Sequence, residues 1–423
     1  MKPPRLSSLA GSLLGSEILK IAADVRALGA EGLEICNLTV GDFAPSEFRI
    51  PGEVEQGIID RLRLGETNYP PAEGVLALRE AVRTLYQREL GLDPSLASVI
   101  VTSGSRPGIY ATYRGLVDPG ERVVYPTPSW NNPYYVQLVG AVGVPVPVGP
   151  ESRFMPTRAS LEDAVRDARL LILCSPQNPA GTTFTEESLG AICDLVLEEN
   201  ARRGSAERPL YVMYDQVYWT LTFDGARHVH PVQVRPAMAP YTIYIDGASK
   251  SLAATGIRVG WIVAPEDLAG PMSALIGHMG AWAPKAEQGA VAAFLEDAAA
   301  FTTFRDEMIV KVRERLALLY EGLIAMRESG LPVDVIAPEG AIYLSAKFAL
   351  QGRVTPDRTR LDGDEAVRAY LLRAAGLAVV PLRAFGSEED TQWFRLSVGA
   401  VSPGEIERVM PKLRTALEAT KGS

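Results

Sequence analysis

The middle of the chain alternates short apolar runs with longer segments of mixed polarity. Several runs are continuously apolar, which is typical of strands buried on both faces of a parallel sheet. Helical patterns lie between several of them, at 107–117, 160–167 and 185–200. Strands that alternate with helices predict a layered α/β domain. The expected strands are 98–102, 121–125, 142–148, 168–174, 209–214, 241–245 and 257–263.

The pattern changes after about residue 285. A long helical stretch, 285–328, leads into three further strand candidates and a terminal helix at 403–419. We therefore expect a large α/β domain over 51–295 and a smaller α+β domain that combines 1–50 with 296–423. The strand candidates of the smaller domain are 341–346, 377–381 and 393–398.

The composition of the chain argues against several classes of function. Its 423 residues include 42 Lys and Arg against 51 Asp and Glu, a net charge of −9, and no basic run, so nucleic acid is not an expected partner. The three histidines and three cysteines are scattered, so we expect no metal site, disulfide framework or histidine-driven triad. No apolar stretch reaches about 18 residues and no signal-peptide pattern opens the chain, which predicts a cytoplasmic protein without a membrane partner.

Polar or small residues follow the ends of four expected strands, where ligands bind in open α/β sheets. Small and apolar neighbours surround Lys250, and they would lower the pKa of its amine and activate it as a nucleophile. Each fragment alone is also typical of a structural role, such as a turn, a helix cap or a solvated lysine. SGSRPG is typical either of a tight turn or of a phosphate-binding helix start. The strand exits present SGSRPG at 103–108, Asn178, Asp215 with Tyr218, and Lys250.

The segment around Lys250, IDGASKSLAATGIRVGW, resembles the lysine signature of class I/II pyridoxal-phosphate aminotransferases, fold type I enzymes that include aspartate aminotransferase. Further landmarks of this family follow its order over about residues 15–415: NYPPAEGVLALREAV, VTSGSRPGIY, YPTPSW, CSPQNPAGT, YDQVYW and FRLSVGA. The resemblance implies a mostly parallel seven-stranded sheet sandwiched by helices, with a smaller α+β domain. It also implies pyridoxal 5′-phosphate as the cofactor.

The resemblance assigns roles around the cofactor ring. Lys250 would form the Schiff base with the cofactor aldehyde and would then move the substrate proton. Asp215 would pair with the ring nitrogen, and Tyr218 and Asn178 would hydrogen-bond the ring oxygen. Trp130 would stack on the face of the ring.

A second group of residues would bind the cofactor phosphate. In the family this group comprises backbone N–H groups at a helix start, side chains near the lysine, and a tyrosine from the neighbouring subunit. The tyrosine implies a homodimer with a shared active site. The corresponding residues are Gly104, Ser105 and Arg106 at the helix start, Ser249 and Arg258 near the lysine, and Tyr69 from the neighbour.

The resemblance also implies the substrates, an amino acid and a 2-oxo acid. Arg395 would bind the α-carboxylate with two parallel hydrogen bonds, with Gly41 and Asn178 beside it. Aspartate is the favoured donor, aromatic or aliphatic amino acids are the alternatives, and 2-oxoglutarate is the expected acceptor. The candidate cations for a distal carboxylate are Arg49, Arg106 and Lys285.

Three positions depart from the family pattern. Gly247 stands where serine is common, so we expect the phosphate to lose one hydroxyl contact. Gln216 replaces an acidic residue that often follows the aspartate, which we expect to matter little. The motif GDFAPSEF at 41–48 replaces the commoner GEPDF near the substrate, which leaves the choice of substrate open.

Other functions compete with an aminotransferase. A carbon–sulfur or other α-carbon lyase of the same fold would share nearly all site residues. A non-enzymatic cofactor-binding regulator would need a DNA-binding module, and residues 1–50 are too short and not basic enough for one. A nicotinamide dehydrogenase is disfavoured because no GxGxxG follows an expected strand.

Overall fold

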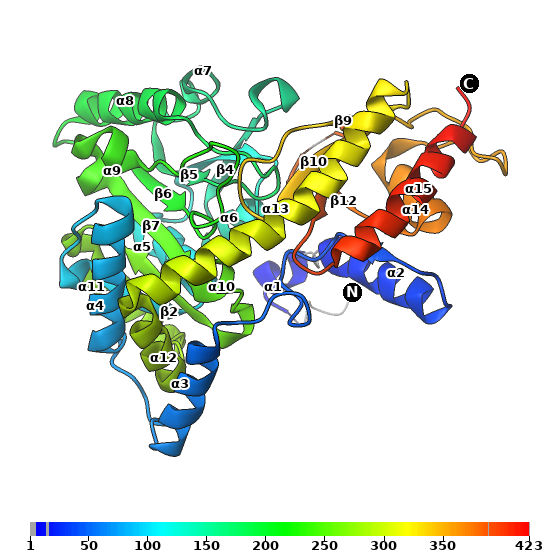
Figure 1. The fold of residues 1–423 in the computed structure, drawn as a ribbon. Helices are drawn as coiled ribbons and strands as arrows, with labels where there is room; N and C mark the ends of the chain where they lie inside the picture. The colour runs from blue at the N-terminus through cyan, green and yellow to red at the C-terminus, as the bar shows by residue number, and fades with distance from the viewer. Residues whose placement is uncertain (1–5, 14–16, 388, 423) are drawn as a thin grey trace.

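The computed structural model describes residues 6–13, 17–387 and 389–422. A seven-stranded sheet lies within its larger part, on the left of Figure 1. Neighbouring strands are parallel except at β8, which is antiparallel to both of its neighbours. The apolar runs predicted every one of these strands to within two residues at each end. In sheet order the strands are β2 (Val99–Ser103), β8 (Val259–Val263), β7 (Thr242–Gly247), β6 (Tyr211–Asp215), β5 (Ala168–Cys174), β3 (Arg122–Thr127) and β4 (Val142–Pro147).

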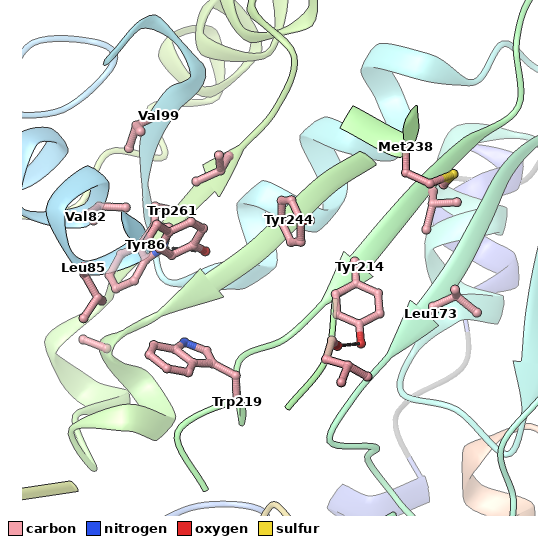
Figure 2. Packing of buried hydrophobic residues seen from close by; sticks show 14 of the residues in the cluster. Val82, Leu85, Tyr86, Val99, Leu173, Tyr214, Trp219, Met238, Tyr244 and Trp261 are labelled. Carbon is pink, nitrogen blue, oxygen red and sulfur yellow. Dashed lines mark hydrogen bonds between the residues drawn. The ribbon is translucent and has the colours of Figure 1, made fainter. Parts of the chain in front are cut away.

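Both faces of this sheet are buried. Successive side chains of a strand point to opposite faces, so each strand contributes to two separate cores. Leu171 and Tyr244 belong to the core on one face, whereas their chain neighbours Ile172 and Ile243 belong to the core on the other. Figure 2 shows the first of these cores, in which the Trp261 indole donates a hydrogen bond of 3.2 Å to the Tyr86 hydroxyl.

Helices cover each face of the sheet and supply the rest of the two cores. The first core takes residues from α4 (Leu76–Leu85), α8 (Glu186–Arg203) and α12 (Lys285–Glu296). The second takes residues from α5 (Ser105–Leu116), α6 (Asn132–Val139) and α11 (Glu266–Met279). Shorter or peripheral helices are α1 (Ser8–Ser12), α3 (Gly52–Arg63), α7 (Arg158–Leu161), α9 (Pro231–Val234) and α10 (Ala248–Ser251).

A third core lies under a smaller antiparallel sheet. The long helix α13 (Ala298–Glu328) runs from the large sheet to this region (Figure 1): Phe301 packs in the first core, and Met308 and Val312 pack in the third. The small sheet has the order β12 (Val380–Pro381), β13 (Trp393–Ser397), β10 (Tyr343–Phe348) and β9 (Val333–Val335), and α14 (Gly363–Ala375) and α15 (Pro403–Ala419) pack with it.

The N-terminal helix α2 (Glu17–Ala30) lies against these late elements. Its Asp24 pairs with Arg368 of α14 at 2.8 Å, and Val25 packs on Leu372. The following strand β1 (Cys36–Asn37) pairs in parallel with β11 (Leu377–Ala378). The division into domains over 51–295 and over 1–50 with 296–423 stays a prediction.

Three predicted elements differ from the structure. The helical stretch 285–328 is two helices, because the Asp297 side chain accepts hydrogen bonds from Ala299 N and Ala300 N and starts α13 anew. The predicted strand 377–381 is divided between β11 and β12, which pair with different partners. The predicted helix 160–167 gives way to turns after α7. Among the described helices, none is both long enough and apolar enough to cross a membrane.

Candidate active site

A cavity of about 650 Å³ lies beyond the carboxyl ends of the parallel strands β5, β6 and β7. Its position follows the rule for ligand sites in open α/β sheets. Residues of the segment 39–42 and of β13 line it as well, so early, middle and late parts of the chain meet there. The predicted residues that line it are Gly41, Ser105, Arg106, Trp130, Asn178, Asp215, Tyr218, Ser249, Lys250, Arg258 and Arg395.

Lys250 lies in α10, directly after β7, and extends into the cavity. Its Nζ atom donates a hydrogen bond of 2.6 Å to the carbonyl oxygen of Gly41. The same atom lies 5.7 Å from the ring centres of both Phe43 and Tyr218. Two aromatic rings and one carbonyl therefore hold the amine in one direction.

The surroundings of Lys250 favour its neutral, nucleophilic form. Burial lowers the pKa of the amine to about 8, and the negative charge of Asp42 opposes this shift. Three arginines around the cavity add to the lowering of the pKa: Arg395, Arg106 and Arg258. A lysine with this pKa is partly free amine near neutral pH, as attack on an aldehyde requires.

Asp215 ends β6 opposite Cys174 of β5. Its carboxylate accepts a long hydrogen bond, 3.3 Å, from the backbone N–H of Val217. Burial raises the pKa of Asp215 to about 6, while the Val217 N–H and the charge of Lys250 oppose the rise. A carboxylate in this setting favours a cationic N–H partner, since such a pair supplies both charge and a hydrogen bond.

A cradle for an anion forms where β2 meets α5. Gly104 has a φ of 73°, and a Cβ atom there would lie only 2.1 Å from Nη2 of Arg258, so the close approach requires glycine. The Arg258 guanidinium donates to Thr255 O at 2.7 Å and to Ser103 O at 2.9 Å. The first N–H groups of α5 have no acceptor within the helix, so an anion finds both donors and a positive dipole end here.

Arg395 is the central side chain of the small sheet at the cavity. It is 1% exposed, and its guanidinium carbon lies 4.7 Å from the ring centres of both Tyr343 and Phe385. Its Nη1 donates to Asn178 Oδ1 at 3.2 Å and its Nη2 to Thr39 O at 2.7 Å. Burial lowers the pKa of Arg395, but a guanidinium stays charged, so a fixed, planar cation faces the cavity.

Arg106 is a second cation that lines the cavity. The Arg106 guanidinium carbon lies 5.2 Å from the Trp130 ring centre, and both side chains line the cavity. This cation–π contact orients Arg106 without neutralising its charge.

Four predicted residues are not among those that line the cavity: Gly104, at the start of the anion cradle, and Tyr69, Arg49 and Lys285. Tyr69 is 81% exposed, as a residue that serves a neighbouring subunit would be in a single chain. Arg49 is exposed and pairs with Glu55 at 2.6 Å. Lys285 is partly buried and donates a hydrogen bond of 2.8 Å to the side chain of Asn68. Of the three candidates for a distal carboxylate, Arg106 alone lines the cavity.

Sequence reasoning missed four polar residues that line the cavity: Thr39, Asp42, Thr255 and Tyr343. Tyr343 was predicted only as part of the strand 341–346, and Thr255 only as part of the lysine motif. Asp42 is adjacent to Gly41, and its carboxylate accepts a hydrogen bond of 2.6 Å from Thr255 Oγ1. The position of Asp42 beside a predicted substrate residue was the signal available for it.

The departure from the family at Gly247 has a steric reason. A Cβ atom at this position would lie 2.7 Å from Cα of Gly260 and 2.9 Å from the Val259 carbonyl oxygen. Both contacts are to backbone that cannot move aside easily, so the close packing of β7 on β8 excludes serine here.

The departure at Gln216 lies within a buried hydrogen-bond network. Gln216 is fully buried, and its Nε2 donates to the Tyr86 hydroxyl at 3.1 Å. The same hydroxyl donates to Asp246 Oδ2 at 3.1 Å. Gln216 therefore joins the loop after Asp215 to the strand that precedes Lys250 through a continuous buried network.

These features fit pyridoxal phosphate. The carboxylate of Asp215 suits a protonated ring nitrogen, the cradle at Gly104 suits a phosphate, and the amine of Lys250 suits an aldehyde. No cluster of three or more metal-ligating side chains occurs among residues 6–13, 17–387 and 389–422.

Comparison with known proteins gives one consistent family. A family model described as aminotransferase class I and II matches residues 34–413. Aspartate aminotransferase of Rhizobium meliloti (strain 1021) is 31% identical over 408 residues, which cover 95% of this chain and 94% of that protein. The crystal structure of the aspartate aminotransferase from Rhizobium meliloti has a TM-score of 0.90 at 29% identity, covering 99% of this chain and 100% of that one. The structure of Thermus thermophilus aspartate aminotransferase with maleate has a TM-score of 0.86 at 26% identity, covering 98% and 100%.

Proposed function

The chain belongs to the class I and II aminotransferases, which use pyridoxal phosphate, and on this premise we propose that it transfers the amino group of L-aspartate to 2-oxoglutarate. The observation that carries the proposal is the gathering of Lys250, Asp215 and Arg395 around one cavity. Aromatic and aliphatic amino acids are the alternative donors.

In the proposed reaction, bound pyridoxal phosphate supplies an electron sink for the electron pair released at the substrate α-carbon. Lys250 takes the proton from that carbon and returns it on the way to product, a role that suits an amine with a pKa of about 8. Asp215 keeps the ring nitrogen protonated by charge pairing, and Tyr218 and Asn178 donate hydrogen bonds to the ring oxygen.

Arg395 binds the substrate α-carboxylate in this proposal. The rings of Tyr343 and Phe385 fix the plane of the guanidinium before substrate arrives, so little side-chain freedom is lost on binding. Gly41 and Asn178 lie beside the same group: Asn178 accepts a hydrogen bond from Arg395, and a Cβ atom on Gly41 would lie 3.4 Å from Arg395 Nη1. A side chain at position 41 would crowd the carboxylate site.

A dicarboxylic substrate is favoured because the cavity holds two cations besides Lys250 and Arg258, which are assigned to the cofactor. These two are Arg395 and Arg106, from different elements. Arg395 would bind the α-carboxylate, and Arg106, oriented by Trp130, would bind the distal one. The solved Thermus thermophilus enzyme is named as a complex with maleate, itself a dicarboxylate, which supports the same class here. Aspartate, glutamate and their 2-oxo acids have the required two negative charges.

A homodimer with a shared active site is part of the proposal. Tyr69 would bind the cofactor phosphate of the neighbouring subunit, which agrees with its exposure of 81%. Exposed apolar residues occur on both sides of Tyr69 in the sequence, and their burial between subunits would favour association: Leu62, Leu64 and Leu76. The domain boundary near residue 295 and a cytoplasmic location are kept as predictions.

A half-reaction assay tests the proposed function. The purified protein with bound cofactor is mixed with each amino acid in turn, and conversion to the amine form of the cofactor is followed by absorbance. Aspartate should convert the cofactor, and 2-oxoglutarate should reverse the change. A lyase would instead release an α-carbon product without any added 2-oxo acid, and no spectral change with any amino acid would refute the proposal.

A further inference from the structure

Tyr343 connects two parts of the cavity that the sequence treats as separate. It begins β10 of the small sheet, is 1% exposed, and lines the cavity. Its hydroxyl lies 2.5 Å from the hydroxyl of Tyr218, which follows β6 of the large sheet. The two rings meet edge to face at a centroid distance of 5.4 Å, so their relative orientation is fixed as well.

The Arg395 guanidinium extends this contact to the substrate site. It lies over the face of the Tyr343 ring at 4.7 Å. Its positive charge lowers the pKa of both Tyr343 and Tyr218, against the rise that burial causes in each. A continuous series of side-chain contacts therefore runs from the carboxylate site to the cofactor site, through Arg395, Tyr343 and Tyr218.

The number of protons limits what this pair of hydroxyls can do. Each tyrosine hydroxyl carries one proton and can donate one hydrogen bond. If Tyr218 donates to the ring oxygen of the cofactor, it cannot also donate to Tyr343. The short contact between them then requires Tyr343 to donate and Tyr218 to accept. A hydroxyl that accepts one hydrogen bond becomes a stronger donor in the next.

We propose that Tyr343 is a positioning residue that directs the proton of Tyr218 toward the ring oxygen of the cofactor, and this rests on the function proposed above. The Tyr343 hydroxyl supplies the donated hydrogen bond, and Arg395 strengthens that donation by its charge. In this proposal Tyr343 acts only through the hydroxyl of Tyr218. Its effect is on the ionisation of the cofactor, which it stabilises in the anionic form through Tyr218.

A purely structural role for Tyr343 would give a different result. In that case the ring alone matters, as a platform that holds Arg395. Phe385 is the matched control, because its ring also lies 4.7 Å from the Arg395 guanidinium and carries no hydroxyl. Loss of the Phe385 ring should weaken substrate binding, and loss of the Tyr343 hydroxyl should change the cofactor.

The experiment uses the protein with bound cofactor and no substrate. The visible absorbance is titrated with pH for the wild type, Tyr343→Phe and Phe385→Leu, and the midpoint of the spectral change is recorded. Tyr343→Phe should raise the midpoint by about half a unit to one unit, the effect of one hydrogen bond between two neutral hydroxyls. Phe385→Leu should leave the midpoint unchanged but raise KM for aspartate.

A double-mutant cycle adds a second readout. Tyr218→Phe alone should raise the spectral midpoint further than Tyr343→Phe does, because it removes the hydroxyl next to the ring oxygen. Adding Tyr343→Phe to Tyr218→Phe should then cause no further shift of the midpoint, because Tyr343 acts only through the Tyr218 hydroxyl. Equal stoichiometry of bound cofactor and equal Tm establish that each variant is folded.

The outcomes separate the two proposals. An unchanged midpoint in Tyr343→Phe, or a shift of the same size in the Tyr218→Phe background, would overturn the role of Tyr343 and leave the aminotransferase proposal intact. If Tyr343→Phe does not fold, the midpoint of Tyr218→Phe tests the proposal. A midpoint equal to that of the wild type would show that the Tyr218 hydroxyl, through which Tyr343 is proposed to act, does not affect the cofactor. A wild-type protein that shows no absorbance band of a Schiff base between the cofactor and a lysine would refute the proposed function itself.

Discussion

The amine of Lys250 donates a hydrogen bond of 2.6 Å to the carbonyl oxygen of Gly41, although 209 residues separate them in the chain. In the same segment, 39–42, the carbonyl oxygen of Thr39 accepts a hydrogen bond of 2.7 Å from Arg395. The lysine proposed to react with the cofactor and the arginine proposed to bind substrate are therefore held by one short piece of backbone. Movement of this segment would alter both.

The pKa of Lys250 predicts how cofactor attachment depends on pH. Burial lowers this pKa to about 8, and only the neutral amine attacks an aldehyde. We expect the rate at which cofactor-free protein takes up pyridoxal phosphate to rise with pH and to level off above a midpoint near 8. Stopped-flow absorbance measures the rate, with a free alkylamine as the control for ionisation of the cofactor. A midpoint near that of an ordinary lysine, about 10.4, would contradict the prediction.

Arg106 should determine the preference for dicarboxylic substrates. Arg106→Met removes the cation on Trp130 but keeps the backbone N–H proposed to bind phosphate. We expect kcat/KM for aspartate to fall about 10- to 100-fold, the cost of one charge-assisted hydrogen bond, with little change for alanine. Arg49→Met is the matched control, since Arg49 is exposed and pairs with Glu55. An equal fall in kcat/KM for aspartate and alanine would show that Arg106 does not bind the distal carboxylate.

Asp246 should make the stability of the cofactor-free protein depend on pH. Its carboxylate is fully buried and accepts hydrogen bonds from Tyr86 at 3.1 Å and Trp219 at 2.8 Å. Burial raises its pKa to about 7, so the folded state holds this proton more tightly than the unfolded state does. The stability that protonation contributes is fully present below about pH 4 and is lost as pH rises to about 7, by about 1 kcal/mol per unit.

Denaturation by urea at pH 5, 6 and 7 measures this slope. Asp246→Asn should make the slope clearly smaller, and Asp163→Asn, whose side chain is 98% exposed, should leave it unchanged. A residual slope should persist because burial also raises the pKa of Asp215 and of Asp364 to about 6. If Asp246→Asn keeps the wild-type dependence of stability on pH, the carboxyl group of Asp246 is not the source of that dependence.

The shared active site predicts complementation between two inactive variants. Tyr69→Ala should weaken cofactor binding, and Lys250→Ala should abolish attachment. If Tyr69 serves the neighbouring subunit, each mixed dimer contains one site with both changes and one intact site. Subunits dissociated and reassociated in equal amounts should then regain about a quarter of wild-type activity, since half of the dimers are mixed. No gain over the average of the two variants would place Tyr69 in its own subunit's site or outside any site.

Much of the fold was predictable because its signals are local. Continuous apolar runs identified each strand of the large sheet, since both of its faces are buried. The break at Asp297 was missed because the apolar pattern continues across it, although an aspartate before Ala-Ala-Ala is a helix-cap signal. The run 377–381 was predicted as one strand because pattern alone does not show which partner each residue pairs with.

The residues of the candidate site that belong to sequence motifs were predictable. The motifs identified the residues at strand ends, and these line one cavity. Tyr343 was missed because its role depends on a contact with Tyr218, 125 residues away, that no local pattern encodes. The hydrogen bond from Gln216 to Tyr86 was not predictable for the same reason, since it joins residues 130 positions apart.

The central proposal is that Lys250 forms the covalent attachment to pyridoxal phosphate, and one measurement tests it most directly. The purified protein with cofactor is reduced with borohydride and digested, and its peptides are analysed by mass spectrometry, with Lys250→Ala as the control. We expect the reduced cofactor on the peptide that contains Lys250 and on no peptide of the variant. An adduct on a different lysine, or none in the wild type, would contradict the proposed site.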